Sequence, residues 1–243
     1  ALGGGLLTFS ASAPSAYALT GIVVTDNDGP LIVESTTPVT ETNGDGINAT
    51  NNAPGTDLTI TVTDVSGSTN GIYARNYGTG DLSVTATGQV TGTTGRGIYA
   101  RNEGTDLTVS TASASGGLIG ISAINYGSGA LSVRSTGRVT GGNYGIMADN
   151  YSGTDLTISA ASVSGGMGIY ARNRGAGDLL VIATGPVAGT TFGGIFTMND
   201  STGKNLDITV GDVTGATYGI YASNRGTGAM LVTAAGTVTG RGG

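Results

Sequence analysis

Residues 71–92 read GIYARNYGTGDLSVTATGQVTG, and GIYARN begins again at Gly97. The segment contains three short stretches in which apolar and polar residues alternate, and Gly-rich turns separate these stretches. Alternation with a period of two residues is the pattern of a β-strand that buries one of its faces. The segment therefore predicts three strands in each copy of a repeat.

The repeat extends through most of the 243 residues. Successive Gly-Ile pairs are separated by 25, 26, 23, 25, 23, 26 and 25 residues, and we expect a degenerate earlier copy at Gly21. A fixed period of this length indicates a solenoid or another stacked architecture. The copies open at Gly46, Gly71, Gly97, Gly120, Gly145, Gly168, Gly194 and Gly219.

One copy cannot bury its apolar face alone, but stacked copies bury Ile, Leu and Val continuously. We therefore predict an all-β fold, a right-handed parallel β-helix of about nine coils of roughly 25 residues, over residues 19–243. At about 4.8 Å per coil, this rod would be roughly 43 Å long. The side chains of Ile72, Leu82, Val84 and Val90 are expected to point inward.

Composition excludes several classes of protein. With 46 Gly but only 5 Pro, 38% hydrophobic and 11% charged residues, the chain is neither collagen-like nor typical of disorder. The absence of Cys and His excludes disulfide scaffolds and His- or Cys-based catalysis. A net charge of −6 without a basic stripe argues against nucleic acid as a partner. We predict no cofactor.

An Asn follows each repeat Gly by five residues. Because equivalent positions stack, the side-chain amides are expected to donate to the amide carbonyl of the next coil. We therefore predict a structural Asn ladder. Its members are Asn51, Asn76, Asn102, Asn125, Asn150, Asn173, Asn199 and Asn224.

The second and fourth residues after the repeat Gly point outward in the predicted strand. They are frequently aromatic or Arg, residue types that are enriched at binding hot spots. Two interpretations remain open: stacked side chains that stabilise the sheet, or a recognition face. The candidate binding stripe consists of Tyr73, Arg75, Tyr99, Arg101, Tyr170, Arg172, Phe196 and Tyr221, with interruptions at Ser122, Met147 and Asp149.

Acidic residues recur immediately before the first Leu of a predicted strand. Asp at such a position usually accepts hydrogen bonds from nearby backbone amides. Calcium binding and catalysis are the alternatives, but an acid repeated on nearly every coil does not resemble a unique active site. We predict no catalytic and no metal-binding residues. The acids are Asp57, Asp81, Asp106, Asp155 and Asp178.

Residues 1–18 have the pattern of the end of an export signal. The apolar segment 1–9 precedes SASAPSAYA, in which Ala16-Tyr17-Ala18 fits a signal-peptidase site. We therefore expect residues 1–18 to be a signal-peptide remnant and residues 19–243 to be an exported β-helix that belongs to a longer chain.

An export signal followed by tandem Gly-Ile-x-Ala-x-Asn and Asp-Leu-Ser/Thr-Val coils resembles the passenger region of Gram-negative autotransporters. The resemblance covers residues 19–243, and its motifs specify architecture rather than activity. It implies a secreted or outer-membrane, cell-surface location and a stalk or adhesin that contacts a protein or glycan of a host or neighbouring cell. It also implies a C-terminal outer-membrane barrel in the full-length chain.

Parallel β-helices also include polysaccharide lyases and glycosidases, which use clustered acids on one face. This class is the alternative for the present chain. The short and regular repeat steps leave no space for the long loops that form such active sites, so we predict a non-enzymatic protein.

Overall fold

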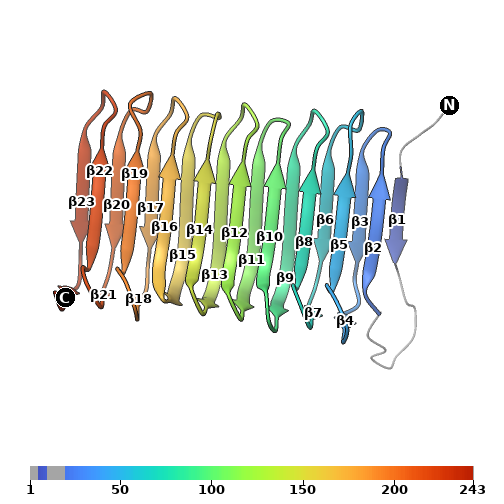
Figure 1. Ribbon diagram of the computed structural model, residues 1–243, viewed down its shortest axis with the longest axis horizontal. Coiled ribbons are helices and arrows are strands. Elements are labelled where there is room, and N and C mark those ends of the chain that lie inside the picture. The colour runs from blue at the N-terminus through green and yellow to red at the C-terminus, as the bar shows by residue number, and fades with distance from the viewer. Residues whose placement is uncertain (1–4, 10–19, 243) are drawn as a thin grey trace.

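The computed structural model describes residues 5–9 and 20–242. These residues form nine stacked coils of a right-handed parallel β-helix, with the two ends of the rod far apart (Figure 1). No helix occurs in the described part of the chain, and thus none that is long and apolar enough to cross a bilayer. The predicted fold class, number of coils and repeat length are confirmed.

One side of the rod is a sheet of nine parallel strands, each containing the Gly-Ile-x-Ala-x-Asn motif or its equivalent. Each coil contributes one strand, so the sequence period becomes the spacing between coils. The strands are β2 (Ile22–Asp26), β5 (Ile47–Asn51), β8 (Ile72–Asn76), β10 (Arg96–Asn102), β12 (Ile119–Asn125), β14 (Tyr144–Asn150), β16 (Met167–Asn173), β19 (Ile195–Asn199) and β22 (Ile220–Asn224).

The rest of each coil belongs to a sheet of fifteen parallel strands that bends around the rod. Its longer segments follow the Asp-Leu turn, and its shorter ones contain the Val-x-Gly motif. The strands are β1 (Gly5–Phe9), β3 (Leu31–Ser35), β4 (Val39–Glu41), β6 (Leu58–Val62), β7 (Val65–Gly67), β9 (Leu82–Gly92), β11 (Leu107–Gly116), β13 (Leu131–Gly141), β15 (Leu156–Gly165), β17 (Leu179–Ala183), β18 (Val187–Gly189), β20 (Leu206–Val210), β21 (Val213–Gly215), β23 (Met230–Ala234) and β24 (Val238–Gly240).

The sequence predicts three strands in every coil, but in the middle of the rod the second and third are continuous. β9, β11, β13 and β15 each have 10 or 11 residues. A register shift between Thr111 and Ala114 marks the corner between the two segments, because a bulge lets a strand bend without ending. In a later coil Pro186, which has no amide hydrogen, separates β17 from β18.

The interior of the rod is a continuous column of aliphatic side chains. Ile72, Leu82, Val84 and Val90 have no exposed surface, as predicted. In-register pairing places Leu107 between Leu82 and Leu131 of the adjacent coils, so each aliphatic residue packs on its equivalents. Burial of this kind stabilises a fold by roughly 1.5–3 kcal/mol per side chain.

The Gly of the Val-x-Gly motif is required by a close approach of two backbone segments. A β-carbon at Gly141 would overlap the carbonyl oxygen of Tyr144 and would lie 2.6 Å from the nitrogen of Gly120. The chain turns there from the fifteen-stranded sheet into the nine-stranded sheet. This contact explains why the motif ends in Gly in copy after copy.

The two ends of the rod differ. At the N-terminal end, β1 pairs in parallel with β3, so Gly5–Phe9 lies in the fifteen-stranded sheet. The expected cleavage motif at Ala16–Ala18 falls outside the described residues. In the last described coil, the apolar side chains remain accessible, and Met230 is 52% exposed.

Candidate binding face

The outward side of the nine-stranded sheet carries the predicted stripe. In β8, Ile72 and Ala74 are buried in the core, whereas Tyr73 and Arg75 are partly exposed on the other side of the strand. Parallel in-register pairing makes each outward residue the neighbour of its equivalent one coil away. Repetition of the motif therefore produces columns of similar side chains along the rod.

The first column contains the residue after each repeat Ile. The rings of Tyr73 and Tyr99 stack with centroids 4.7 Å apart and an interplanar angle of 18°. Ser122 and Met147 occupy the next two positions of the column, so the aromatic stack ends there.

The aromatic stack resumes three coils further along. The rings of Tyr170 and Phe196 are 5.1 Å apart, and those of Phe196 and Tyr221 are 5.0 Å apart, with interplanar angles of 2° and 4°. The five aromatic residues of the predicted stripe therefore form two separate stacks, one in each half of the rod.

A second column consists of the residues that directly follow each ladder Asn, at the start of the turn, and arginine side chains pack on its rings. The guanidinium carbon of Arg101 lies 5.4 Å from the ring centroid of Tyr77 and 4.9 Å from that of Tyr126. Tyr126 stacks on Tyr151 at 4.5 Å, and Arg174 covers Tyr151 at 4.0 Å. The candidate stripe predicted from the sequence lacks four residues of this column, although each directly follows a ladder Asn: Tyr77, Tyr126, Tyr151 and Arg174.

A third column precedes the repeat Gly and was also missed. Arg96 lies over the ring of Tyr99 at 4.7 Å, and Tyr144 contacts Tyr170 edge-on at 6.1 Å. We call these three columns, together with the outward arginines Arg75, Arg101 and Arg172 of the strands, the tyrosine–arginine face. It consists of Tyr73, Tyr77, Tyr99, Tyr126, Tyr144, Tyr151, Tyr170, Phe196, Tyr218 and Tyr221 with Arg75, Arg96, Arg101, Arg172 and Arg174.

Nearly all tyrosines of the protein lie on this face. The chain has 10 Tyr, and all of them except Tyr17, which is outside the described residues, belong to the three columns. Outward positions of the fifteen-stranded sheet are mostly Ser and Thr, as in β11 (LTVSTASASG) and β15 (LTISAASVSG). Aromatic residues are therefore concentrated on one side of the rod.

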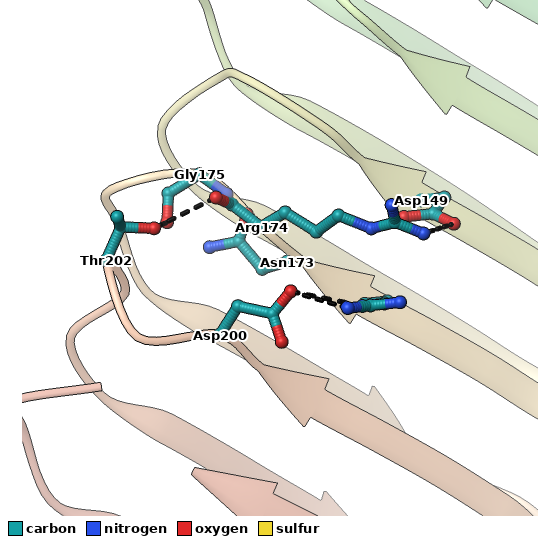
Figure 2. Close-up of polar contacts among 7 residues, drawn as sticks. Asp149, Asn173, Arg174, Gly175, Asp200 and Thr202 are labelled. Carbon is teal, nitrogen blue, oxygen red and sulfur yellow. Dashed lines mark hydrogen bonds and ion pairs between the residues drawn. The ribbon is translucent and has the colours of Figure 1, made fainter. Parts of the chain in front are cut away.

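The arginines in the C-terminal half of the face are paired with carboxylates. Arg174 Nη2 lies 3.3 Å from Asp149 Oδ2, and Arg172 Nη2 lies 2.7 Å from Asp200 Oδ2. Figure 2 shows Arg174 extending across the sheet toward Asp149, while Thr202 donates to the carbonyl oxygen of Arg174 from the next turn. These contacts link successive coils.

The N-terminal half has fewer carboxylates. Arg101 Nη2 contacts Glu103 Oε1 at 2.6 Å, and Arg75 donates to Thr50 Oγ1 at 3.1 Å. Neither Arg75 nor Arg96 takes part in an ion pair among the described residues.

Burial and neighbouring charges alter the acidity of groups on the face. Burial raises the pKa of Tyr99, and Tyr73 adds to this effect, while Arg101 and Arg96 oppose it. Burial also raises the pKa of Asp149 above its usual range, against the effect of Arg174 and Arg172. Because the folded protein binds a proton to Asp149 more readily than the unfolded chain does, this effect favours folding at low pH and is lost as the pH rises through the folded-state pKa.

Each Asn of the predicted ladder ends a strand of the nine-stranded sheet, and all of them are buried except Asn224, which is partly exposed in the last described coil. Five consecutive residues form an unbroken chain of side-chain hydrogen bonds, and each Nδ2 donates to the Oδ1 of the next coil. The bonds run from Asn76 to Asn102 (3.0 Å), Asn102 to Asn125 (3.2 Å), Asn125 to Asn150 (3.2 Å) and Asn150 to Asn173 (3.0 Å).

The chain of hydrogen bonds is interrupted beside Asn51 and Asn199, contrary to the expectation of one ladder through all eight copies. In both coils the first apolar residue of the next strand follows the Asn by seven positions, as opposed to five or six positions in the other copies. The longer turn lacks the usual bond from a backbone amide to the Asn side chain, and Oδ1 of both residues is buried without a partner. Asn199 still donates to Asn224 at 3.3 Å.

The repeated acids form a second set of contacts between coils. We expected them to accept hydrogen bonds from nearby backbone amides, and in the structure each accepts from a backbone amide of the next coil. In-register stacking places that amide directly beside the carboxylate. Asp57 accepts from the amide of Asp81 (2.8 Å), Asp81 from Asp106 (2.9 Å), Asp106 from Ala130 (2.6 Å), Asp155 from Asp178 (2.8 Å) and Asp178 from Asn205 (2.9 Å).

Three hollows on the described surface lie along the short strands of the fifteen-stranded sheet and have volumes of about 170, 290 and 310 Å³. Asp64 lines the smallest, and no carboxylate lines the other two. The described residues also contain no group of three or more His, Cys, Asp or Glu side chains that could hold a metal ion.

No protein-family model, curated protein or solved structure matches the chain. The class of protein is therefore defined by its own architecture, a right-handed parallel β-helix with aromatic and guanidinium side chains concentrated on one sheet.

Proposed function

We propose that the chain is a surface-displayed passenger of the autotransporter type, exported by a Gram-negative bacterium, which adheres to other surfaces through its tyrosine–arginine face. The observation that carries this proposal is the concentration of stacked Tyr and Arg side chains on one sheet. Tyr and Arg provide contact area and directional donors at binding sites. The parallel β-helix supplies a rod that holds this face away from a cell.

A repetitive face favours a repetitive partner. Several coils present related side chains on the same side of the rod, so an extended ligand can make many weak contacts that add by multivalency. A glycan chain or a fibrous protein on a host or neighbouring cell has this repetition, whereas a small molecule does not. The fold also occurs in enzymes, but none of the three hollows has the two carboxylates that glycoside hydrolysis requires.

The proposal is tested by replacing four residues of the face, Tyr99, Arg101, Tyr170 and Arg172, with Ser. We expect adhesion of cells that display this variant to fall to background, because both halves of the face lose an aromatic ring and a guanidinium group. The circular dichroism spectrum should remain that of a β-protein, since all four side chains point away from the core.

The matched control changes four outward residues of the other sheet, Thr108, Ser110, Thr157 and Ser159, to Ala. This variant should adhere as the wild type does. Undiminished adhesion of the first variant would contradict the proposal, and so would cleavage of a polysaccharide by the purified chain.

A further inference from the structure

We propose that the N-terminal half of the tyrosine–arginine face binds an acidic glycan, a chain of sugars that carries carboxylate or sulfate groups. This inference rests on the proposed adhesive function and assigns a ligand class and a position to it. The subsite consists of Arg75, Arg96 and Arg101 with the rings of Tyr73, Tyr77, Tyr99 and Tyr126.

The two halves of the face differ in how their arginines are neutralised. In the C-terminal half, Asp149 and Asp200 already occupy the guanidinium groups of Arg174 and Arg172. In the N-terminal half, Glu103 is the only carboxylate that forms an ion pair with the three arginines among the described residues. A protein with a net charge of −6 thus has a local excess of positive charge here.

Aromatic rings hold the unpaired arginines in place. The guanidinium carbon of Arg75 lies 4.9 Å from the ring centroid of Tyr73, and that of Arg96 lies 4.7 Å from the centroid of Tyr99. The Nε atoms of both arginines are buried and have no hydrogen-bond partner. Recognition of an anion therefore depends on the terminal nitrogens, whose planar fork matches the two oxygens of a carboxylate or sulfate.

The tyrosines complete a surface suited to sugar hydroxyls. Tyr73 and Tyr99 stack face to face, and both side chains are partly exposed. No hydrogen bond among the described residues uses the phenol oxygens of this pair. A phenol both donates and accepts, as sugar hydroxyls do.

The repeat of the rod also matches an extended chain. Coils follow each other at about 4.8 Å, a distance comparable with the advance per sugar in an extended polysaccharide. A glycan that runs along the rod axis therefore meets an equivalent Tyr and Arg pair on the two adjacent coils that contain β8 and β10. The unpaired guanidinium groups then favour acidic over neutral glycans, because a carboxylate or sulfate group can form an ion pair with them and a neutral sugar cannot.

Binding of the purified chain to polygalacturonate, dextran sulfate and neutral dextran tests the inference. We expect binding to at least one of the two polyanions, weakening as salt is added because screening reduces the attraction between charges, and no binding to neutral dextran. The two polyanions distinguish carboxylate from sulfate as the recognised group.

Three variants locate the subsite. R75Q/R96Q should weaken affinity about tenfold or more, which corresponds to roughly 1.4 kcal/mol. R172Q/R174Q, the matched control for lost positive charge, should stay within about threefold of the wild type because its arginines are already paired. E103Q should bind about threefold tighter, since it releases Arg101, and a gain of affinity cannot result from misfolding.

Several results would overturn the inference: no binding to either polyanion, equal binding to neutral dextran, equal loss in the two arginine pairs, or unchanged affinity of E103Q. If purified protein binds no polyanion but the four-residue Ser variant still abolishes adhesion, the acidic glycan is excluded while the adhesive face remains. If that variant adheres normally, the proposed function itself fails.

Discussion

Replacing Leu107 with Ala should lower the free energy of unfolding by about 3–5 kcal/mol. Leu107 has no exposed surface and packs between Leu82 and Leu131 of the adjacent coils. The cavity left by the smaller side chain is closed above and below by residues held in register by their own backbone hydrogen bonds. The interior therefore has little freedom to collapse around the vacancy, and the expected loss is at the upper end for a large-to-small substitution.

Chemical denaturation followed by circular dichroism measures this loss. The matched control is Leu118→Ala, because Leu118 lies at the turn of the same coil and is 48% exposed. It should change the free energy of unfolding by no more than about 0.5 kcal/mol. Similar effects of the two substitutions would mean that Leu107 does not lie in the core of the rod.

Replacing Asn102 with Ala should cost about 3 kcal/mol, because more than one buried polar group loses its partner at roughly 1–3 kcal/mol each. The side-chain nitrogen Nδ2 of Asn102 donates to the carbonyl oxygens of Thr105 and Asp106 and to Oδ1 of Asn125. It also accepts from Asn76. Removal of the side chain thus breaks contacts within its own turn and with both adjacent coils.

Asn150→Ala should have a similar effect, whereas Asn224→Ala in the last described coil should cost about 1 kcal/mol. The amide of Asn224 bonds to carbonyl oxygens that are accessible to water, so its loss leaves groups that solvent can satisfy. Equal and small losses at all three positions in urea denaturation would refute a stabilising ladder.

The sequence predicted the fold well because the repeat carries it redundantly. Each inward Ile, Leu or Val has equivalents in adjacent copies, so the period and the two-residue alternation identify the core without knowledge of any long-range contact. The number of coils follows from the number of copies of the repeat. The break in the ladder at Asn51 and Asn199 was missed because a turn longer by one residue shifts hydrogen bonds without disturbing the repeat.

The sequence predicted only part of the tyrosine–arginine face, and the reason is geometric. Alternation within the strand identifies outward residues such as Tyr73 and Arg75, but it gives no direction for residues in turns. Tyr77, Tyr126 and Tyr151 lie after the ladder Asn, where the chain leaves the strand, and they join the face because Arg101 and Arg174 bridge to their rings. Which arginines are neutralised depends on contacts between coils, which a single copy of the motif does not contain.

The central claim is that the rod itself adheres through one sheet, and a blocking measurement tests it most directly. Purified wild-type chain, added before cells that display the same chain, should occupy the partner surface and inhibit attachment in a dose-dependent manner. The chain with Tyr99, Arg101, Tyr170 and Arg172 changed to Ser should not inhibit at the same concentrations. Equal inhibition by both chains, or inhibition by neither, would contradict the account.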